Sequence, residues 1–265
     1  MVIGIPELSG SERFRLGQAA LAREGLVAAV RAAPGVVVRQ VAGSALAEIA
    51  GVRGGLAAAD ARDLLDGVAV AGRSVQDVAF GRELAALGER ELPAEWAVDD
   101  PEADPLVRAL AVERALLERG VPAEEAELAR TLVLARGTGL DVAFCWFDGA
   151  RGEAMVDGGI RAAELRFRIG RASRCRAELL GAAEALEVAE RQAAVLLEVA
   201  LAGRVRPERV ARLLGVEPSV AVEEGRYLQR TALLKREVPD RGHWVAGPRF
   251  PAEAARRGRA TSPWW

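Results

Sequence analysis

Cysteine, histidine and lysine are scarce in this chain. Its 265 residues include two cysteines, Cys145 and Cys175, and one histidine, His243. A structural zinc site needs about four cysteine or histidine ligands, so the composition excludes such a site, and any bound metal is expected to be a hard cation held by carboxylates. The low cysteine count also argues against a disulfide framework and predicts a reducing, cytoplasmic location.

Long uncharged segments are absent as well. The stretches QVAGSALA and VAFCWF are far shorter than the roughly 18–20 apolar residues of a membrane-spanning helix. The N-terminal segment MVIGIPELSGSER has neither the basic flank nor the long apolar core of a secretory signal. We therefore predict a protein without a membrane span. Apolar residues still make up 51% of the chain, which is enough for a packed core.

Charge is distributed unevenly along the chain. Lys235 is the single lysine among 36 basic residues, so the others are arginines. Residues 1–150 hold 15 basic and 23 acidic side chains, a net charge of −8, whereas residues 151–265 hold 21 and 15, a net charge of +6. This asymmetry indicates two parts with different partners, the second of which could approach a polyanion. The alternative is that the two halves attract each other.

The first third of the chain is typical of α/β structure. The pattern predicts a strand at residues 2–5, a helix at about 16–33 and a second strand at 35–41, where β-branched residues follow Pro34. The apolar run 67–72 could add a third strand. Strand, helix and strand in this order favour parallel pairing.

Two further segments divide the chain. Residues 91–105 collect three prolines and six acidic residues, as a linker or exposed excursion does. Residues 106–134 have helical periodicity that is interrupted at 120–122. We predict an acidic N-terminal accessory region, α/β or helical, over residues 1–135 and a second domain over residues 140–261.

The second domain is predicted to contain a sheet. LDVAFCWFDG at 140–149 is typical of a buried strand that ends in a turn, and residues 165–169 alternate apolar and arginine side chains as a half-exposed strand does. A helix is expected at 175–192. The apolar run 194–203 fits either a helix or a strand.

Acidic residues spread over the second domain are the candidate metal ligands. Carboxylates that converge on one point repel each other unless they share a divalent cation, and Mg²⁺ or Mn²⁺ held in this way can activate water for attack on a phosphodiester. The candidates are Asp148, Glu178, Glu198 and Glu253. His243 lies ten residues before the last of them.

The order of these residues resembles that of the ribonuclease H-like nuclease superfamily. The matching motifs lie within residues 140–261 and are Asp148-Gly149-Ala150, Ala177-Glu178-Leu179, Glu198, Gly242-His243 and Glu253. The tail GPRFPAEAARRGRA is also similar to the NurA branch of DNA-end-processing nucleases. The resemblance implies a mixed α/β sheet, two bound metal ions and metal-dependent hydrolysis of nucleic acid, with DNA favoured over RNA. It further implies that Asp148, Glu178 and Glu253 are catalytic and that His243 assists.

A helix-turn-helix is an alternative interpretation of residues 207–230. Gly215 would permit the tight turn, and Pro218 would begin the second helix. That helix carries Glu223 and Glu224, whose charges oppose an approach to phosphates. We therefore expect a helical hairpin first and a DNA-binding element second.

A third interpretation is a non-catalytic subunit of a larger assembly. The chain ends in GRATSPWW, and local periodicity cannot bury Trp264 and Trp265. Exposed terminal aromatic side chains suggest docking on the rest of the fold, on a partner protein or on another copy in a homo-oligomer.

Overall fold

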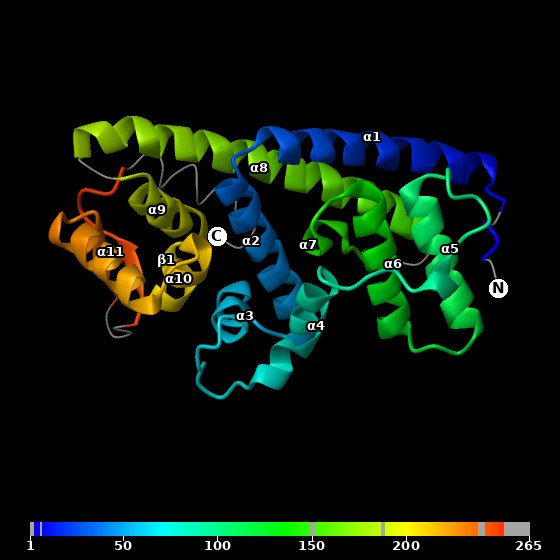
Figure 1. The fold of residues 1–265 in the computed structure, drawn as a ribbon, viewed down its shortest axis with the longest axis horizontal. Helices are drawn as coiled ribbons and strands as arrows, with labels where there is room; N and C mark the ends of the chain where they lie inside the picture. The colour runs from blue at the N-terminus through cyan, green and yellow to red at the C-terminus, as the bar shows by residue number, and fades with distance from the viewer. Residues whose placement is uncertain (1–2, 6, 149–151, 187–188, 238–241, 252–265) are drawn as a thin grey trace. The chain divides into compact units, whose positions relative to one another are not determined.

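The chain folds mainly into α-helices. The computed structural model describes residues 3–5, 7–148, 152–186, 189–237 and 242–251. Within these residues the strands form a single small sheet, antiparallel and in the order β1-β3-β2 (Figure 1). A ribonuclease H-like fold needs a larger mixed sheet. The predicted α/β class and the resemblance to that superfamily, with its NurA branch, are therefore wrong.

The chain forms two compact units. The first unit comprises Met1–Ala32, Ala45–Leu65 and Ala69–Arg166, and the second comprises Ala33–Ser44, Asp66–Val68 and Phe167–Trp265. Two helices, α2 (Gly35–Gly54) and α8 (Gly152–Leu186), contribute residues to both units. The domain ranges 1–135 and 140–261 expected from the sequence stay a prediction.

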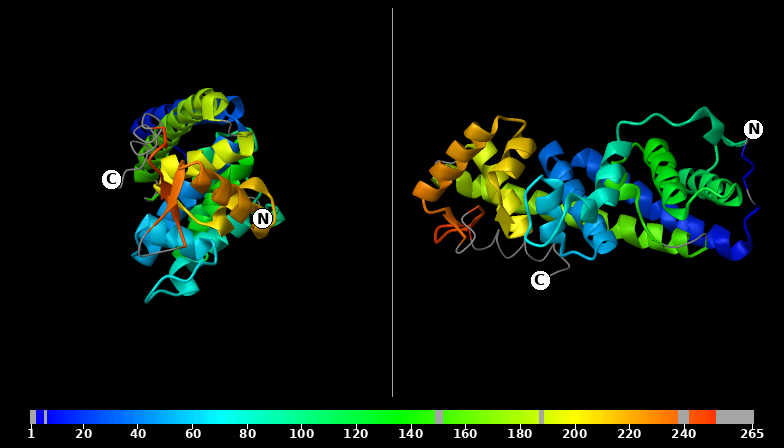
Figure 2. Two further views of the ribbon diagram at one scale, coloured as in Figure 1. Left: turned by 90° about the vertical axis from the view of Figure 1, so that its left-hand side faces the viewer. Right: turned by 90° about the horizontal axis from the view of Figure 1, so that it is seen from below.

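The other elements are assigned to one unit each. Those of the first unit are α1 (Gly10–Ala32), α3 (Ala58–Leu65), η1 (Val75–Val78), α4 (Ala79–Leu87), η2 (Ala94–Trp96), α5 (Pro105–Glu118), α6 (Ala123–Thr138) and α7 (Val142–Cys145). Those of the second unit are α9 (Glu190–Ala202), β1 (Arg204–Val205), α10 (Pro207–Leu214), α11 (Pro218–Arg230), β2 (Leu234–Arg236) and β3 (Trp244–Ala246). Figure 2 gives two further views of these elements.

Helix α8 replaces the half-exposed strand predicted at residues 165–169. Its buried side chains recur every three or four residues, which is the spacing of one helical face. The buried positions are Ala154, Met155, Gly158, Ala162, Leu165, Arg168, Ile169, Ala172, Cys175 and Leu179. The alternation of arginine and apolar residues is short, whereas the helical period persists over the whole element, so the longer pattern determines the structure.

The strand predicted at residues 140–149 is also wrong. Asp141 accepts a hydrogen bond from the amide of Ala143 at 2.8 Å and caps the single-turn helix α7. Phe144, Trp146 and Phe147 are all buried. The aromatic residues that suggested a strand instead fill the core of the first unit from a short helix and the loop after it.

The N-terminal βαβ prediction is only partly correct. The predicted helix at 16–33 is confirmed as part of α1. Residues 35–41 are helical in α2, and residues 67–72 form turns and an irregular loop, so those two strand predictions are wrong. Ile3 makes an isolated parallel bridge with Val98 in place of a longer strand. The β-branched run after Pro34 therefore continues into a helix, because the sequence that follows it has helical periodicity.

The predictions for residues 91–105 and 106–134 are confirmed. Two helices, α5 and α6, are separated by Gly120, which has a positive φ of 77°. Such a φ is open to glycine without a steric penalty. The segment 91–105 contains one 3₁₀ turn, η2, and otherwise connects α4 to α5.

Helix α2 is the described helix that is long and apolar enough to cross a membrane. Half of its most apolar window is buried inside the protein. A core helix of a folded protein passes the same test, so its composition is weak evidence for a span. Gln40 in this helix is fully buried and donates a hydrogen bond to the carbonyl of Ala194 at 3.0 Å. The cytoplasmic location stays a prediction.

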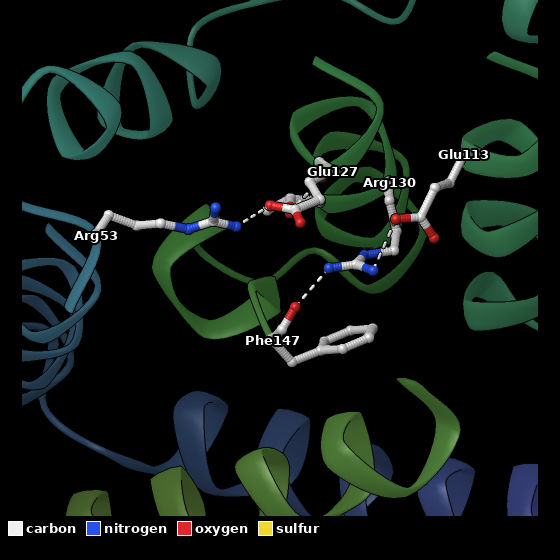
Figure 3. Close-up of polar contacts among 6 residues, drawn as sticks. Arg53, Glu113, Glu127, Arg130 and Phe147 are labelled. Carbon is white, nitrogen blue, oxygen red and sulfur yellow. Dashed lines mark hydrogen bonds and ion pairs between the residues drawn. The ribbon is translucent and has the colours of Figure 1, made fainter. Parts of the chain in front are cut away.

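A buried arginine links three elements of the first unit. Arg130 of α6 is almost fully buried and donates from Nη1 to Oε1 of Glu113 in α5 at 2.8 Å. Its Nη2 donates to the carbonyl oxygen of Phe147, and its guanidinium carbon lies 4.4 Å from the centre of the Phe147 ring (Figure 3). In the same view, Arg53 of α2 pairs with Glu127 of α6. These contacts hold α5, α6 and the loop after α7 together.

Candidate nucleic-acid interface

The second unit contains a helix-turn-helix followed by a β-hairpin. Helices α10 and α11 are joined at Gly215, which has a φ of 63°, and α11 begins with Pro218. The amide of Val216 donates to the carbonyl of Ala211 at 3.0 Å and closes the end of α10. The predicted helical hairpin over 207–230 is therefore confirmed.

The hairpin follows directly after α11. Strand β3 pairs with β2 on one side and with β1 on the other, and β1 lies between α9 and α10 in the sequence. The register places Lys235 opposite Val245 and Arg236 opposite Trp244. Helix, strand, two helices and a hairpin in this order form a helix-turn-helix with a wing, and the left view of Figure 2 shows its helices and the orange strands. We call residues 190–237 and 242–250 the winged module.

Trp244 fixes α11 against the sheet. Its side chain is fully buried, and it lies against Gly225 in the middle of α11. A Cβ atom at position 225 would lie 2.1 Å from Cη2 of the Trp244 ring. The close approach of helix and strand therefore requires a glycine at this position.

Glu224 is turned toward α9 and does not reach the outer face of α11. It is only 4% exposed, forms an ion pair with Arg191 and accepts a hydrogen bond from Nε2 of Gln192 at 2.7 Å. Its charge is thus compensated inside the module. Of the two glutamates whose charges would repel DNA phosphates, Glu224 is therefore absent from the exposed face of α11.

The exposed face of α11 carries a line of polar side chains. Ser219, Glu223, Arg226 and Arg230 are all exposed and follow one another at helical spacings of three and four residues. Lys235 is exposed on strand β2, directly after this helix. The face therefore presents two guanidinium groups and one carboxylate. Sequence reasoning missed it, although the spacing of the four residues is visible in the sequence.

Glu198 has a structural partner. It is buried in α9, and Arg209 of α10 donates from Nε to its Oε1 at 3.3 Å. Asp66 lies 3.9 Å from Nη1 of the same arginine and also pairs with Arg212. The charge of Glu198, and then that of Asp66, raises the pKa of Arg209 above its usual value against the opposing effect of burial. This network holds α10 onto α9.

His243 is buried in the winged module. Its Nε2 accepts a hydrogen bond from Nε of Arg206 at 2.9 Å, and its Nδ1 lies 3.7 Å from Oε2 of Glu237. The acceptor role of Nε2 toward Arg206 fixes the orientation of the imidazole ring. The geometry is that of a positioned core histidine, and its predicted catalytic assistance stays a prediction.

The remaining candidate metal ligands lie in different parts of the chain. Asp148 is exposed in the loop after α7 and belongs to the first unit, whereas Glu178 is half-buried in the part of α8 that belongs to the second. Glu253 lies outside the described residues, as do Trp264 and Trp265. Among the residues described, no group of three or more His, Cys, Asp or Glu side chains is arranged to hold a metal ion. The predicted Mg²⁺ or Mn²⁺ site and the catalytic roles stay predictions.

Comparison with known proteins identified no relative of this chain. The chain matches no protein-family model, no curated protein and no solved structure.

Proposed function

We propose that the protein binds double-stranded DNA through helix α11 of its winged module. The observation that carries this proposal is a helix-turn-helix whose second helix exposes Arg226 and Arg230 while Glu224 is buried and paired. A helix of this kind lies in the major groove, where its side chains reach base edges and phosphates. The β2–β3 hairpin carries Lys235 toward the backbone beside the groove.

The dimensions of α11 suit this role. Its 13 residues correspond to about 20 Å of helix at a rise of about 1.5 Å per residue, and the major groove is about 12 Å wide. Arginine can donate two hydrogen bonds to guanine or bind a phosphate, and a glutamate can accept a hydrogen bond from the amino group of cytosine. Arg226, Arg230 and Glu223 thus provide complementary contacts along one helical face.

Metal-dependent cleavage of nucleic acid is not part of this proposal. That prediction depended on the resemblance to ribonuclease H-like nucleases, and the helical fold contradicts the resemblance. The helix-turn-helix was the alternative interpretation of residues 207–230, and its helices are those that the structure contains.

Replacement of both Arg226 and Arg230 by alanine is expected to weaken binding to duplex DNA at least tenfold at low salt. Each lost phosphate contact also lowers the salt dependence of the association constant by about one unit of the log–log slope, so we expect a decrease of about two. Fluorescence anisotropy of a labelled duplex at several salt concentrations measures both quantities. Glu223→Gln should act in the opposite direction and tighten binding to duplexes of mixed sequence.

The matched control is Arg82→Ala, which removes an exposed arginine from α4 in the first unit. It should leave the affinity and the salt slope unchanged. Wild-type affinity in the Arg226→Ala, Arg230→Ala double variant would contradict the proposed role of α11, whereas equal losses in the double variant and the control would indicate non-specific attraction.

A further inference from the structure

The first unit carries an exposed apolar face on two of its helices. Phe14 and Leu21 of α1 are 68% and 70% exposed, and Val156 and Ile160 of α8 are 41% and 62% exposed. Exposed apolar side chains that occur singly need no explanation, but a contiguous group indicates a docking surface. We call these four residues the α1–α8 face.

The two helices lie side by side in the first unit. A Cβ atom at Gly159 of α8 would be 3.2 Å from Cα of Ala19 in α1, and one at Gly25 of α1 would be 2.9 Å from Nη1 of Arg166 in α8. Positions 19 and 25 thus meet positions 159 and 166 in the same order, so the helices run in the same direction, as Figure 1 shows. On each helix the exposed apolar residues lie opposite the buried ones, so they form one continuous surface.

The pattern along α1 is self-complementary. Phe14 and Leu21 are separated by two turns, with the exposed Gly17 between them, and a Cβ atom at Gly17 would have open space around it. Arg13 and Glu24 flank the same stripe and are both exposed. If a second α1 lies antiparallel across a two-fold axis near Gly17, Phe14 of each copy meets Leu21 of the other and Arg13 approaches Glu24. Glycine at the axis permits a close approach of the two helices.

We propose that this α1–α8 face is the interface of a symmetric homodimer, with the two α1 helices antiparallel. From Arg13 to Glu24 the surface is about 17 Å long, and it is two helix widths, or about 20 Å, across. It therefore covers roughly 350 Å² per copy, which is less than the roughly 800 Å² per partner of a standard interface and is typical of a weak dimer. The opposite charges at Arg13 and Glu24 select a second copy as the occupant, because each copy supplies both members of the pair.

Sedimentation of the full-length protein tests the dimer without any DNA, so its outcome is independent of the proposed DNA binding. The wild type is expected to have twice the monomer mass at about 100 μM, and Leu21→Glu is expected to have the monomer mass. Val52→Glu is the matched control, since Val52 is 59% exposed on α2, a helix that contributes no residue to the α1–α8 face, and it should remain dimeric. A monomeric wild type, or a dimeric Leu21→Glu variant with native circular dichroism, overturns the proposal.

A charge exchange tests the antiparallel register. Arg13→Glu alone should raise the dimer dissociation constant at least tenfold, because it places two carboxylates against each other. The combination of Arg13→Glu with Glu24→Arg should return the constant to within about threefold of the wild-type value. Failure of the second change to rescue the first overturns the antiparallel arrangement.

Cysteine cross-linking tests the position of the axis. Both native cysteines are buried, whereas Gly17 and Gly10 are exposed and have open space for a side chain. Under mild oxidation, Gly17→Cys should form a covalent dimer. Gly10→Cys should not, because the two copies of position 10 would be about 20 Å apart along the helix axis. Cross-linking of both variants to the same extent indicates parallel helices and overturns the proposal.

The chain's own C-terminal segment is the competing occupant of this face. A variant that ends at residue 251 lacks Trp264 and Trp265, which the sequence suggests as docking residues. This truncated variant should be a dimer, like the wild type, if the face binds a second copy. A monomeric wild type together with a dimeric truncated chain shows that the segment covers the face, and this result overturns the homodimer.

Discussion

Replacement of Arg130 by methionine is expected to destabilise the first unit by about 3–5 kcal/mol. Methionine keeps much of the volume and removes the charge, which leaves the buried carboxylate of Glu113 and the carbonyl of Phe147 without the guanidinium that both now contact. An uncompensated buried charge is among the most costly changes in a protein interior. The contact between the guanidinium and the Phe147 ring is lost as well.

The destabilisation caused by Arg130→Met should increase with pH. Burial raises the pKa of Glu113 above its usual 4.5, against the opposing effect of Arg130. Without Arg130 this pKa should rise further. A carboxyl group with a raised pKa in the folded state binds more protons than it does when unfolded, so the stability of the variant should fall as pH rises above about 4.5. The difference in stability between the wild type and the Arg130→Met variant should be smallest below that pH.

Hydrogen exchange of the α5 and α6 amides measures this effect locally, because both helices belong to the first unit. Arg114→Met is the matched control. Arg114 follows Glu113 in the sequence, and its ion pair with Glu118 is exposed. Its replacement should lower the stability by less than about 1 kcal/mol. The double variant Arg130→Met, Glu113→Leu should recover part of the loss. Protection in Arg130→Met equal to that of the wild type would show that the pair contributes nothing to stability.

Gly225→Ala is expected to destabilise the winged module by about 2–3 kcal/mol. In an ordinary helix interior this change stabilises a protein by about 0.5–1 kcal/mol, but here the added methyl group would enter the Trp244 ring at 2.1 Å. Either α11 or the strand that carries Trp244 must shift, and inserting a methyl group into a tightly packed site costs about 1–3 kcal/mol. Because α11 would be displaced, DNA binding should weaken as well.

Because a glycine-to-alanine change in a helix usually stabilises a protein, destabilisation by Gly225→Ala is a specific prediction. Gly181→Ala in α8 is the control, because a Cβ atom there meets nothing within 4 Å. It should be neutral or stabilising when unfolding of the second unit is followed in urea. Shortening Trp244 to leucine should reduce the penalty of Gly225→Ala, which tests the contact directly. A stabilised Gly225→Ala variant would show that helix and strand are not in close contact.

Helices with clear end signals could be predicted from the sequence. Gly120 separates α5 from α6, and Gly215 with Pro218 separates α10 from α11; in each case the residue at the turn adopts a conformation that glycine favours. The strand predictions failed because they relied on short windows. Three consecutive valines after Pro34 and the alternation at residues 165–169 indicate strands locally, but both lie inside long helices whose packing determines the structure.

The site depends on contacts that the sequence does not show. Glu223 and Glu224 are adjacent in sequence, but only Glu224 is buried. The difference arises because α9 places Arg191 and Gln192 beside Glu224. The same holds for Gly225, whose role is visible only once Trp244 is placed against it. In contrast, the line from Ser219 to Arg230 follows from helical spacing alone and could have been predicted.

Binding of the intact protein to a DNA duplex of about 30 base pairs, compared with a single strand of the same length, tests DNA recognition by the winged module most directly. Competition experiments at several salt concentrations should show tighter binding to the duplex, with an association constant that falls linearly with salt on logarithmic axes. Equal affinity for the two nucleic acids, or no binding even at low salt, would contradict a helix that lies in the major groove.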